Sequence, residues 1–459
     1  MLQYLQQAKR GIHMTSRKLT QRELIFIGTM LFGLFFGAGN LIFPVFVGQQ
    51  AGDHLWPAVI GFLISGVGLP LLGVAAIGIT KVDGVFGLAE KANRPFAYIF
   101  TILLYLCIGP LFALPRLASI SYEIGLTRFV SAEHQIPALA IYSVVFFAVA
   151  WWFARKPSKI MVYVGKVLTP VFLVVLAVLL IAVVVSPLGQ GQAAVGTYKT
   201  AALSTGFTAG YSTMDALAAL AFGIIVVNAI KQLGITQPTA IAKHTVLAGT
   251  LAAGLMGVIY ALLALLGRNA LGVLARADNG GVILSNVAHQ YFGTAGNVLL
   301  AVIVVIACLK TAIGLITAFG DTAKEMFPHV PYQGVIAVAT LVPMFFANVG
   351  LDRLLSVSTP VLMALYPFAI VLILVGLLSV MFRQHRWLFN LSLLFTAVPA
   401  LLDGLNATGL QASWCISILK IGQFLPGFSA GLGWTVPALV GAVLGILCDQ
   451  LSSRKNNSQ

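Results

Sequence analysis

The chain has 459 residues, of which 59% are hydrophobic and only 9% charged, and a formal net charge of +14. Soluble globular proteins carry about 25% charged residues, so this composition excludes a soluble protein and indicates a membrane protein. The Lys and Arg residues lie in short loops between apolar runs and form no basic face, which argues against nucleic acid as a partner.

Apolar runs long enough to cross a bilayer as helices recur along the whole chain. We therefore expect an all-α polytopic membrane protein with about twelve transmembrane helices. In chain order they cover residues 21–48, 55–80, 95–120, 136–154, 160–186, 205–230, 241–267, 295–320, 332–349, 355–382, 387–403 and 433–450. The apolar stretch 416–424 is either interfacial or re-entrant, and the segment 282–292 predicts a short helix in a loop.

The first span is interrupted near its middle. Residues 37–40, Gly-Ala-Gly-Asn, are followed at once by residues 41–44, Leu-Ile-Phe-Pro. Glycines weaken a helix, and a helix that opens here exposes backbone groups that need protein, water or a ligand as partners. Secondary transporters build substrate and ion sites in this way. At the start of the span, residues 20–23 form a capping-box pattern, which predicts that the helix begins there.

The distribution of cations gives the chain an orientation. The two termini and the even-numbered loops hold 19 of the 27 Lys and Arg residues. The odd-numbered loops and their flanks, with Arg116 counted among them, hold 7, and Lys310 lies inside a span. Because cytoplasmic loops are enriched in Lys and Arg, we expect both termini on the cytoplasmic side.

The first five and the next five spans occupy stretches of similar length. An odd number of spans inserts the second half inverted relative to the first, and each half then opens with a broken helix. The sixth span fits, because Gly206, Gly210 and Gly223 bracket a polar stretch from Tyr211 to Asp215. We divide the chain into a cytoplasmic tail (1–20), a first repeat (21–186), a second repeat (205–382), two final spans (387–450) and a cytoplasmic tail (451–459).

Two ionisable residues, Asp215 and Lys310, lie well inside spans, where exposure to lipid costs at least about 2.5–3.5 kcal/mol. Asp215 is either a structural carboxylate that caps half of a broken helix, or a cation ligand, a partner for a substrate ammonium or a proton carrier. The neighbouring hydroxyls of Ser212 and Thr213 suit Na⁺ or an ammonium group. Lys310 has three possible roles: to pair with a carboxylate such as Asp215, to act as a fixed charge, or to titrate.

Two uncharged polar residues give weaker signals. Asn40 either satisfies freed backbone groups at a simple kink or belongs to a ligand site, and its coincidence with Gly37, Gly39 and Pro44 favours the site. The N-terminal ends of half-helices suit a substrate carboxylate, because their N–H groups carry positive potential. Tyr105, on the third span, is either a packing element or part of the lining of the site.

The sequence contains no motif of an enzyme or of an ATP-driven pump. It has no phosphate-binding Gly-Lys-Ser/Thr loop and no HExxH motif. The four cysteines have no metal-type spacing, so we expect free thiols that act as small hydrophobic groups. No cofactor is expected apart from Na⁺ or H⁺ as a coupling ion.

The chain resembles the bacterial branched-chain amino-acid:cation symporters of the BrnQ type. The resemblance is carried by residues 32–48, 109–116 and 213–215, and it extends from about Leu19 to the last span. It implies a LeuT-like fold, a 5+5 inverted repeat with broken helices one and six, in the bacterial cytoplasmic membrane. It also implies uptake of leucine, isoleucine and valine, coupled to Na⁺ in most members.

The resemblance further implies where the substrate and the cation bind. The branched side chain is expected in an apolar pocket from spans three, six and eight. The substrate-binding residues are then Phe36, Gly37, Ala38, Gly39, Asn40, Tyr105, Ser212, Thr213, Met214 and Asp215. The cation site is expected between the carbonyl groups of Gly33 and Phe36 and the span-eight positions Ala307, Lys310 and Thr311.

At Lys310 the chain departs from the family's pattern, which tends to have a hydroxyl residue there, next to a retained Thr311. An ammonium group brings one positive charge and three donors to the oxygens that a sodium ion would bind. Transport is therefore expected to be Na⁺-coupled by family, or proton-coupled or cation-independent if the amine of Lys310 replaces the ion.

The leading hypothesis is a secondary active transporter that imports branched-chain amino acids by alternating access. The alternatives are an amino-acid exchanger and a membrane sensor without transport. A sensor needs a soluble output domain and a channel needs a continuous polar pore, and the sequence contains neither.

Overall fold

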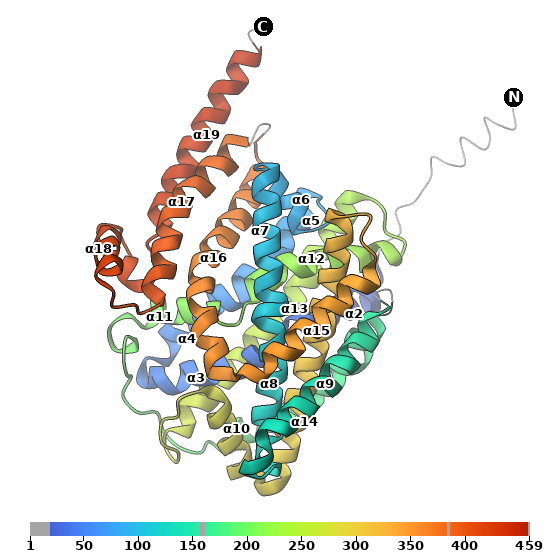
Figure 1. Ribbon diagram of the computed structural model, residues 1–459, viewed down its shortest axis with the longest axis vertical. Coiled ribbons are helices and arrows are strands. Elements are labelled where there is room, and N and C mark those ends of the chain that lie inside the picture. Colours follow the sequence, from blue (N-terminus) through green and yellow to red (C-terminus); the bar gives the residue numbers. More distant parts are fainter. Residues whose placement is uncertain (1–18, 157–158, 160, 383–385, 458–459) are drawn as a thin grey trace, which may run out of the picture.

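The structure is a computed structural model that describes residues 19–156, 159, 161–382 and 386–457. Within these ranges the chain is helical and contains no β-strand (Figure 1). Eleven of its helices are long and apolar enough to cross a membrane. The predicted class, an all-α polytopic membrane protein, is confirmed.

The first five predicted spans are all helical, and several are interrupted. The first span consists of α2 (Gln21–Phe35) and α3 (Ala38–Ala51), and the second of α4 (Leu55–Leu63) and α5 (Leu69–Thr80), joined by a π-helical turn (Ile64–Gly68). The third consists of α7 (Arg94–Leu106) and α8 (Ala113–Gly125), joined by a second π-helical turn (Cys107–Leu111). The fourth is α9 (Gln135–Ala154), and the fifth is α10 (Thr169–Val185), which follows a third π-helical turn (Met161–Leu168). The short helix α6 (Val85–Glu90) precedes α7.

The other predicted spans are present too. They are α11 (Tyr198–Tyr211) with α12 (Asp215–Gln232), α13 (Pro238–Ala270), α14 (Gly280–Met326), α15 (Tyr332–Phe346), α16 (Leu351–Ser379), α17 (Arg386–Ala407) and α19 (Thr435–Asn457), with the short α18 (Ser413–Gly422) between the last two. Short 3₁₀ turns lie at Gly52–His54, Thr127–Phe129, Ala132–His134, Ala347–Val349 and Phe428–Ala430.

The first break changes how the predicted spans are divided into helices. The count is eleven rather than twelve because the break leaves α2 with only 15 residues, while α3 runs on through α4 and α5 as one stretch of 42 residues, Gly39–Thr80. Residues 451–457 of the predicted C-terminal tail continue α19 as a helix, and their cytoplasmic location stays a prediction. The predicted tail 1–20 lies mostly outside the described residues, and the division into two repeats stays a prediction.

Several local predictions are confirmed. Thr20 and Glu23 form the expected capping box at the start of α2. A kink at Gly293, with φ 58° and ψ −136°, separates the first residues of α14 from the rest, so the segment 282–292 is the predicted short helix. The helix α18 has ten residues, too few to cross a bilayer.

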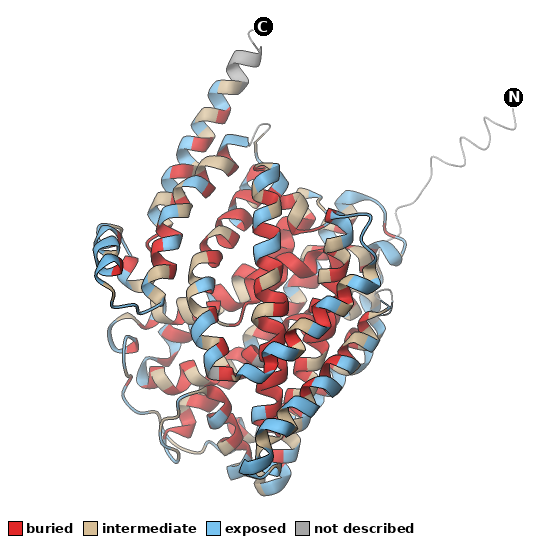
Figure 2. Cartoon of the chain, in the orientation of Figure 1, coloured by how far each residue is buried: buried red, intermediate tan, exposed pale blue. Residues whose placement is uncertain are grey.

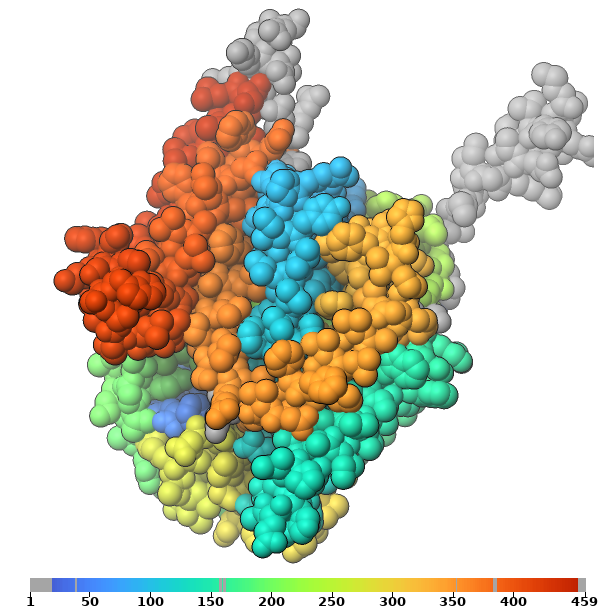
Figure 3. All heavy atoms as spheres, viewed as in Figure 1, coloured from blue at the N-terminus to red at the C-terminus, as the bar shows by residue number. Residues whose placement is uncertain are grey.

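The centre of the bundle is formed by the two broken spans. Figure 2 shows buried residues concentrated in the middle of the bundle, with exposed residues along the outer helices. In its apolar window, α12 is 83% buried, whereas α9 and α19 are each 22% buried. A helix that is apolar on all sides belongs in a core, so α12 is the central helix and α9 and α19 are peripheral. The segment α17–α19 forms a flank on one side of the molecule (Figure 3).

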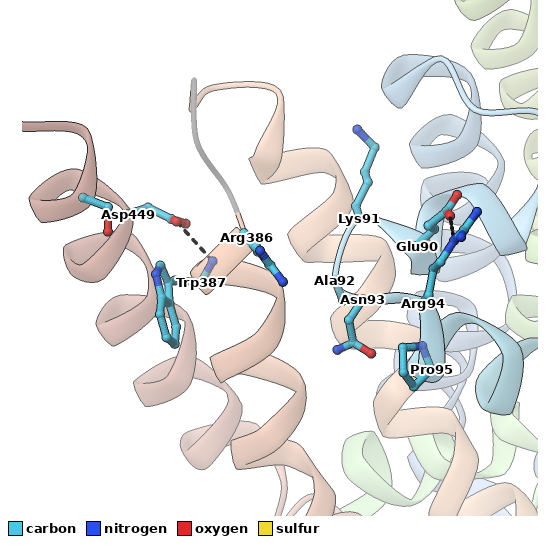
Figure 4. A pocket seen from close by; sticks show the side chains of 10 residues that line it. Glu90, Lys91, Ala92, Asn93, Arg94, Pro95, Arg386, Trp387 and Asp449 are labelled. Carbon is cyan, nitrogen blue, oxygen red and sulfur yellow. Dashed lines mark hydrogen bonds and ion pairs between the residues drawn. The ribbon is translucent and has the colours of Figure 1, made fainter. Parts of the chain in front are cut away.

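A polar groove of about 710 Å³ lies where α17 and α19 approach the connection between α6 and α7 (Figure 4). Asp449 accepts hydrogen bonds from the backbone N–H groups of Trp387 and Leu388, at 3.1 and 2.9 Å, and thereby caps the start of α17. Arg94 pairs with Glu90 at 3.0 Å. The residues of the two helix breaks do not line this groove, so it is separate from the predicted site.

The helices α3 and α13 approach so closely that glycine is required on both. A Cβ on Gly48 would lie 1.8 Å from the carbonyl oxygen of Ala264, and one on Gly267 would lie 1.9 Å from that of Val45. The obstructing atoms belong to the backbone, which yields less readily than a flexible side chain. These contacts hold α3, which follows the first break, against α13.

We expect the substitution Gly267→Ala to push α3 away from α13 and to destabilise the protein by about 1–3 kcal/mol, the usual cost of overpacking. Thermal unfolding in detergent measures this. The matched control is Gly257→Ala on the same helix, where an added Cβ has no atom within 4 Å and the better helix propensity of alanine is unopposed. Equal unfolding temperatures for the two variants would contradict the close approach.

Candidate functional site

The first span breaks at Phe36 and Gly37, between α2 and α3. Phe36 has φ −74° and ψ 86°, and Gly37 has φ −105° and ψ −158°, so both residues leave the helical conformation. The side-chain oxygen Oδ1 of Asn40 accepts the N–H of Gly37 at 2.9 Å. The side-chain amide of Asn40 therefore supplies a hydrogen-bond acceptor for the backbone N–H of Gly37, one of the groups that the break frees.

The sixth span breaks between α11 and α12, as predicted. Met214 has φ 62° and ψ 13°, the left-handed conformation, which costs a side-chain-bearing residue of the order of 1–3 kcal/mol. The hydroxyl of Thr213 donates to the carbonyl oxygen of Gly210 at 2.8 Å. Asp215 follows directly as the first residue of α12, where the positive end of the helix favours a carboxylate.

Asn40 and Asp215 join the two breaks. The side-chain amide Nδ2 of Asn40 donates to both carboxylate oxygens of Asp215, at 2.9 and 2.8 Å. The hydroxyl of Tyr260, on α13, donates to the same carboxylate at 2.6 Å and also contacts Nδ2 of Asn40. All three residues are buried. A residue of span one, one of span six and one of span seven thus share a single buried network.

Arg116 is a buried cation that the sequence analysis assigned to a loop flank. It lies on α8 and is only 4% exposed. Its Nη2 donates to the carbonyl oxygen of Ser212 at 2.9 Å, a group freed by the break of span six. The guanidinium also lies 5.4 Å from the ring centroid of Phe43. The expectation that only Asp215 and Lys310 lie deep in spans is therefore wrong.

Both breaks line one small cavity. Its walls include Gly37, Gly39 and Asn40 from the first break, Thr213, Met214 and Asp215 from the second, and the side chains of Arg116 and Thr311. The remaining wall is apolar and includes Phe35, Ile108, Leu117 and Leu315. The cavity has about 30 Å³ of space, enough for about two water molecules. Seven of the predicted site residues are thus brought together.

Three predicted substrate residues, Tyr105, Phe36 and Ser212, are not among those that line the cavity. The hydroxyl of Tyr105 forms hydrogen bonds with the hydroxyl of Thr322 at 2.6 Å and with the carbonyl oxygen of Ala221 at 3.3 Å. Tyr105 therefore connects α7 to α14 and α12, and it does not line the cavity. Phe36 packs its ring against Phe172 and Tyr260. Ser212 contributes its carbonyl group to Arg116, and Ala38 lies in the first turn of α3.

The predicted cation residues lie between α2, α10 and α14. Ala307, Lys310 and Thr311 share a face of α14, as their spacing requires, and all three are buried. Gly33 lies against α10, because a Cβ at this position would be 2.0 Å from the hydroxyl of Thr169. Thr311 also lines the cavity between the two breaks, so this region adjoins that cavity.

Lys310 contacts aromatic rings instead of oxygens. Its Nζ lies 3.9 Å from the ring centroid of Phe172, 5.2 Å from that of Phe32 and 5.5 Å from that of Phe36. No described residue accepts a hydrogen bond from Nζ. Both predicted contacts, with Asp215 and with span-one carbonyl groups, are therefore absent. Asp215 already has Asn40 and Tyr260 as partners, and the rings surround the amine.

Two expectations about other chemistry can be compared with the described part of the chain. No group of three or more His, Cys, Asp or Glu side chains within it is arranged to hold a metal ion. The four cysteines form no disulfide in the described part of the chain, and three of them are buried.

Sequence reasoning missed Tyr260 and Arg116. Tyr260 is a single tyrosine in an apolar run, and nothing local distinguishes it from a packing residue. Arg116 carried a signal, because it lies within the predicted span 95–120, where an arginine is as costly as Asp215 or Lys310.

Residues 20–452 match the family of branched-chain amino acid transport proteins. The chain is 41% identical to the branched-chain amino acid permease BraB of Bacillus subtilis, over 93% of this chain and 95% of that protein. It is 44% identical to the permease BrnQ of Lactobacillus delbrueckii subsp. lactis, over 92% of this chain and 96% of that one.

The fold is similar to that of solved transporters. Mhp1, a nucleobase-cation-symport-1 family transporter in a closed conformation with bromovinylhydantoin bound, gives a TM-score of 0.58 at 13% identity, over 96% of both chains. MhsT in complex with L-phenylalanine gives 0.52 at 13% identity, over 94% of this chain and 99% of that one. The chain therefore belongs to the branched-chain amino acid transport protein family, has the LeuT-like fold, and is a membrane transporter and not an enzyme.

Proposed function

We propose that the protein imports leucine, isoleucine and valine across the bacterial cytoplasmic membrane by alternating access. The observation that carries the proposal is the buried contact between Asn40 and Asp215, which places a carboxylate and a half-helix N-terminus at one cavity. An ammonium group suits the carboxylate, and a carboxylate suits the N-terminus of α3. The apolar wall of Phe35, Ile108 and Leu117 suits a branched aliphatic side chain.

The cavity has to enlarge before it can hold an amino acid. About 30 Å³ admits only about two water molecules. The substrate's ammonium group would exchange with the amide of Asn40 at the carboxylate of Asp215, which releases the contact between the first and sixth spans. Substrate binding is then coupled to a movement of the two broken helices relative to each other, as alternating access requires.

The orientation follows from the distribution of cations. With Arg116 moved into a span, the odd-numbered loops and their flanks hold 6 Lys and Arg residues against 19 at the termini and in the even-numbered loops. The asymmetry becomes larger, and we propose that both termini are cytoplasmic.

For the coupling ion, the proposal is that the buried amine of Lys310 makes transport independent of sodium. The amine is fully buried, and no described residue accepts a hydrogen bond from it. A sodium ion within about 5 Å of a charged amine would be repelled by roughly 3 kcal/mol at an effective dielectric constant of 20. A buried amine that gains and loses a proton would instead couple transport to the proton gradient. Sodium coupling, the usual case in the family, is the alternative.

Leucine uptake into proteoliposomes is expected to continue without external Na⁺ and to increase when the outside is made more acidic than the lumen. The variant Lys310→Met should lose the stimulation by acid, because it lacks the titrating amine. Lys324→Met, at the exposed end of the same helix, is the control and should behave like the wild type. An absolute requirement for Na⁺ in the wild-type protein would contradict the proposed role of Lys310.

Asn40→Ala and Asp215→Ala are each expected to weaken leucine binding by about 10–100-fold, the loss for a buried hydrogen bond to a charged group. Equilibrium binding of labelled leucine measures this, and gel filtration establishes that the variants are folded. Asp53→Ala, in an exposed turn, is the matched control. Wild-type affinity in both site variants would remove the assignment of this cavity.

Counterflow distinguishes a carrier from the alternatives. Liposomes loaded with unlabelled leucine should accumulate labelled leucine transiently, because a carrier returns loaded with whichever molecule it meets. A sensor would give no accumulation. An exchanger would give counterflow but no net uptake into liposomes without internal amino acid.

A further inference from the structure

Arg116 is a buried charge whose hydrogen-bonding capacity is only partly used. One guanidinium nitrogen, Nη2, donates to the carbonyl of Ser212, whereas Nη1 is buried and has no hydrogen-bond partner among the described residues. Arg116 also forms no ion pair within the described chain. Buried charges without a direct partner are costly, so this group calls for an explanation.

The position of Arg116 favours an anion as the missing partner. The side chain lines the cavity, together with Gly37, Gly39 and Asn40 of the first break. A Cβ on Gly39 would lie 3.3 Å from Nη2, so the guanidinium rests against the first turn of α3. The N–H groups of a first helical turn lack intrahelical acceptors and carry positive potential. A ligand at this point would meet two positive groups, the guanidinium and the helix N-terminus.

Asp215 supplies the opposite charge in the same cavity. The cavity therefore contains one fixed cation and one fixed anion, the complement of a zwitterionic α-amino acid, and binding of such a ligand leaves the net charge of the site unchanged. A substrate without the carboxylate would leave Nη1 unpartnered, which is how a polar site rejects an analogue.

We infer that Arg116 binds the carboxylate of the substrate and selects free α-amino acids against carboxylate-free analogues. Guanidinium groups bind carboxylates through two parallel hydrogen bonds, which fix the orientation of the ligand as well as its charge. This inference rests on the proposed function, since it concerns the same cavity, and it adds a binding residue from span three to those of spans one and six.

A purely structural role for Arg116 is the competing explanation. The contact with Ser212 holds α8 to the break of span six, so its loss alone would disturb the cavity. Such a disturbance would weaken binding of every ligand by a similar factor. A direct contact with the carboxylate would weaken binding only of ligands that have one. The ratio of two affinities separates the two roles.

The test compares leucine with leucinamide, which has the same side chain and amine but a neutral amide in place of the carboxylate. Both compete with labelled leucine for the full-length protein in liposomes. In the wild type, leucinamide is expected to bind at least tenfold more weakly than leucine. In Arg116→Gln, which lacks the guanidinium group, this ratio should fall towards one. Arg128→Gln, at an exposed position further along the same segment, should keep the wild-type ratio.

Each outcome has a definite meaning. If the wild type binds no leucine, the proposed function fails. The assignment of Arg116 is overturned, while the transport function stands, if the wild type binds leucine and leucinamide equally. It is also overturned if Arg116→Gln weakens the binding of both ligands by the same factor. If Arg116→Gln does not fold, Arg116→Lys decides: a point charge without the planar fork should reduce the ratio several-fold, and an unchanged ratio overturns the assignment.

Discussion

The structure depends on the rule that backbone groups inside a membrane need partners. Breaking a helix at mid-depth frees N–H and C=O groups, and lipid offers them nothing. Here polar side chains provide some of the missing partners, since Asn40 accepts the N–H of Gly37 and Arg116 donates to the carbonyl of Ser212. The residues that satisfy the breaks are also residues that line the cavity, so stability of the opened helices and ligand binding rest on the same groups.

This overlap explains why the two broken spans form a unit. Asn40 uses its carbonyl oxygen within span one and its amide nitrogen on Asp215 of span six. The carboxylate is held in turn by Tyr260, which brings span seven into the network. A ligand that replaces a partner in one of these hydrogen bonds therefore changes the contacts among three helices, α3, α12 and α13. We therefore expect a bound ligand to move these helices relative to one another.

The sequence allowed the two breaks and the burial of Asp215 to be predicted, because glycine, proline and a lone charge in an apolar run are local signals. The partners of those residues were not predictable in the same way. Asn40 and Asp215 are 175 positions apart, and Tyr260 looks like any aromatic packing residue. Lys310 is the clearest example. Its position inside a span could be predicted from the sequence, but the three phenylalanine rings around its amine depend on how α2, α10 and α14 pack together.

The glycine contacts between α3 and α13 restrict how the first span can move. At Gly48 and Gly267 the backbones themselves touch, whereas α2 meets α13 at Gly28 through the side chain of Leu251. Contacts between backbones are harder to separate than contacts made by a flexible side chain, so we infer that α3 and α13 move together and that α2 can move relative to them. The least costly joint for such a movement is Phe36–Gly37, where no helical hydrogen bond has to be broken. In this picture α3 stays fixed against α13, and α2 is the half of the first span that moves.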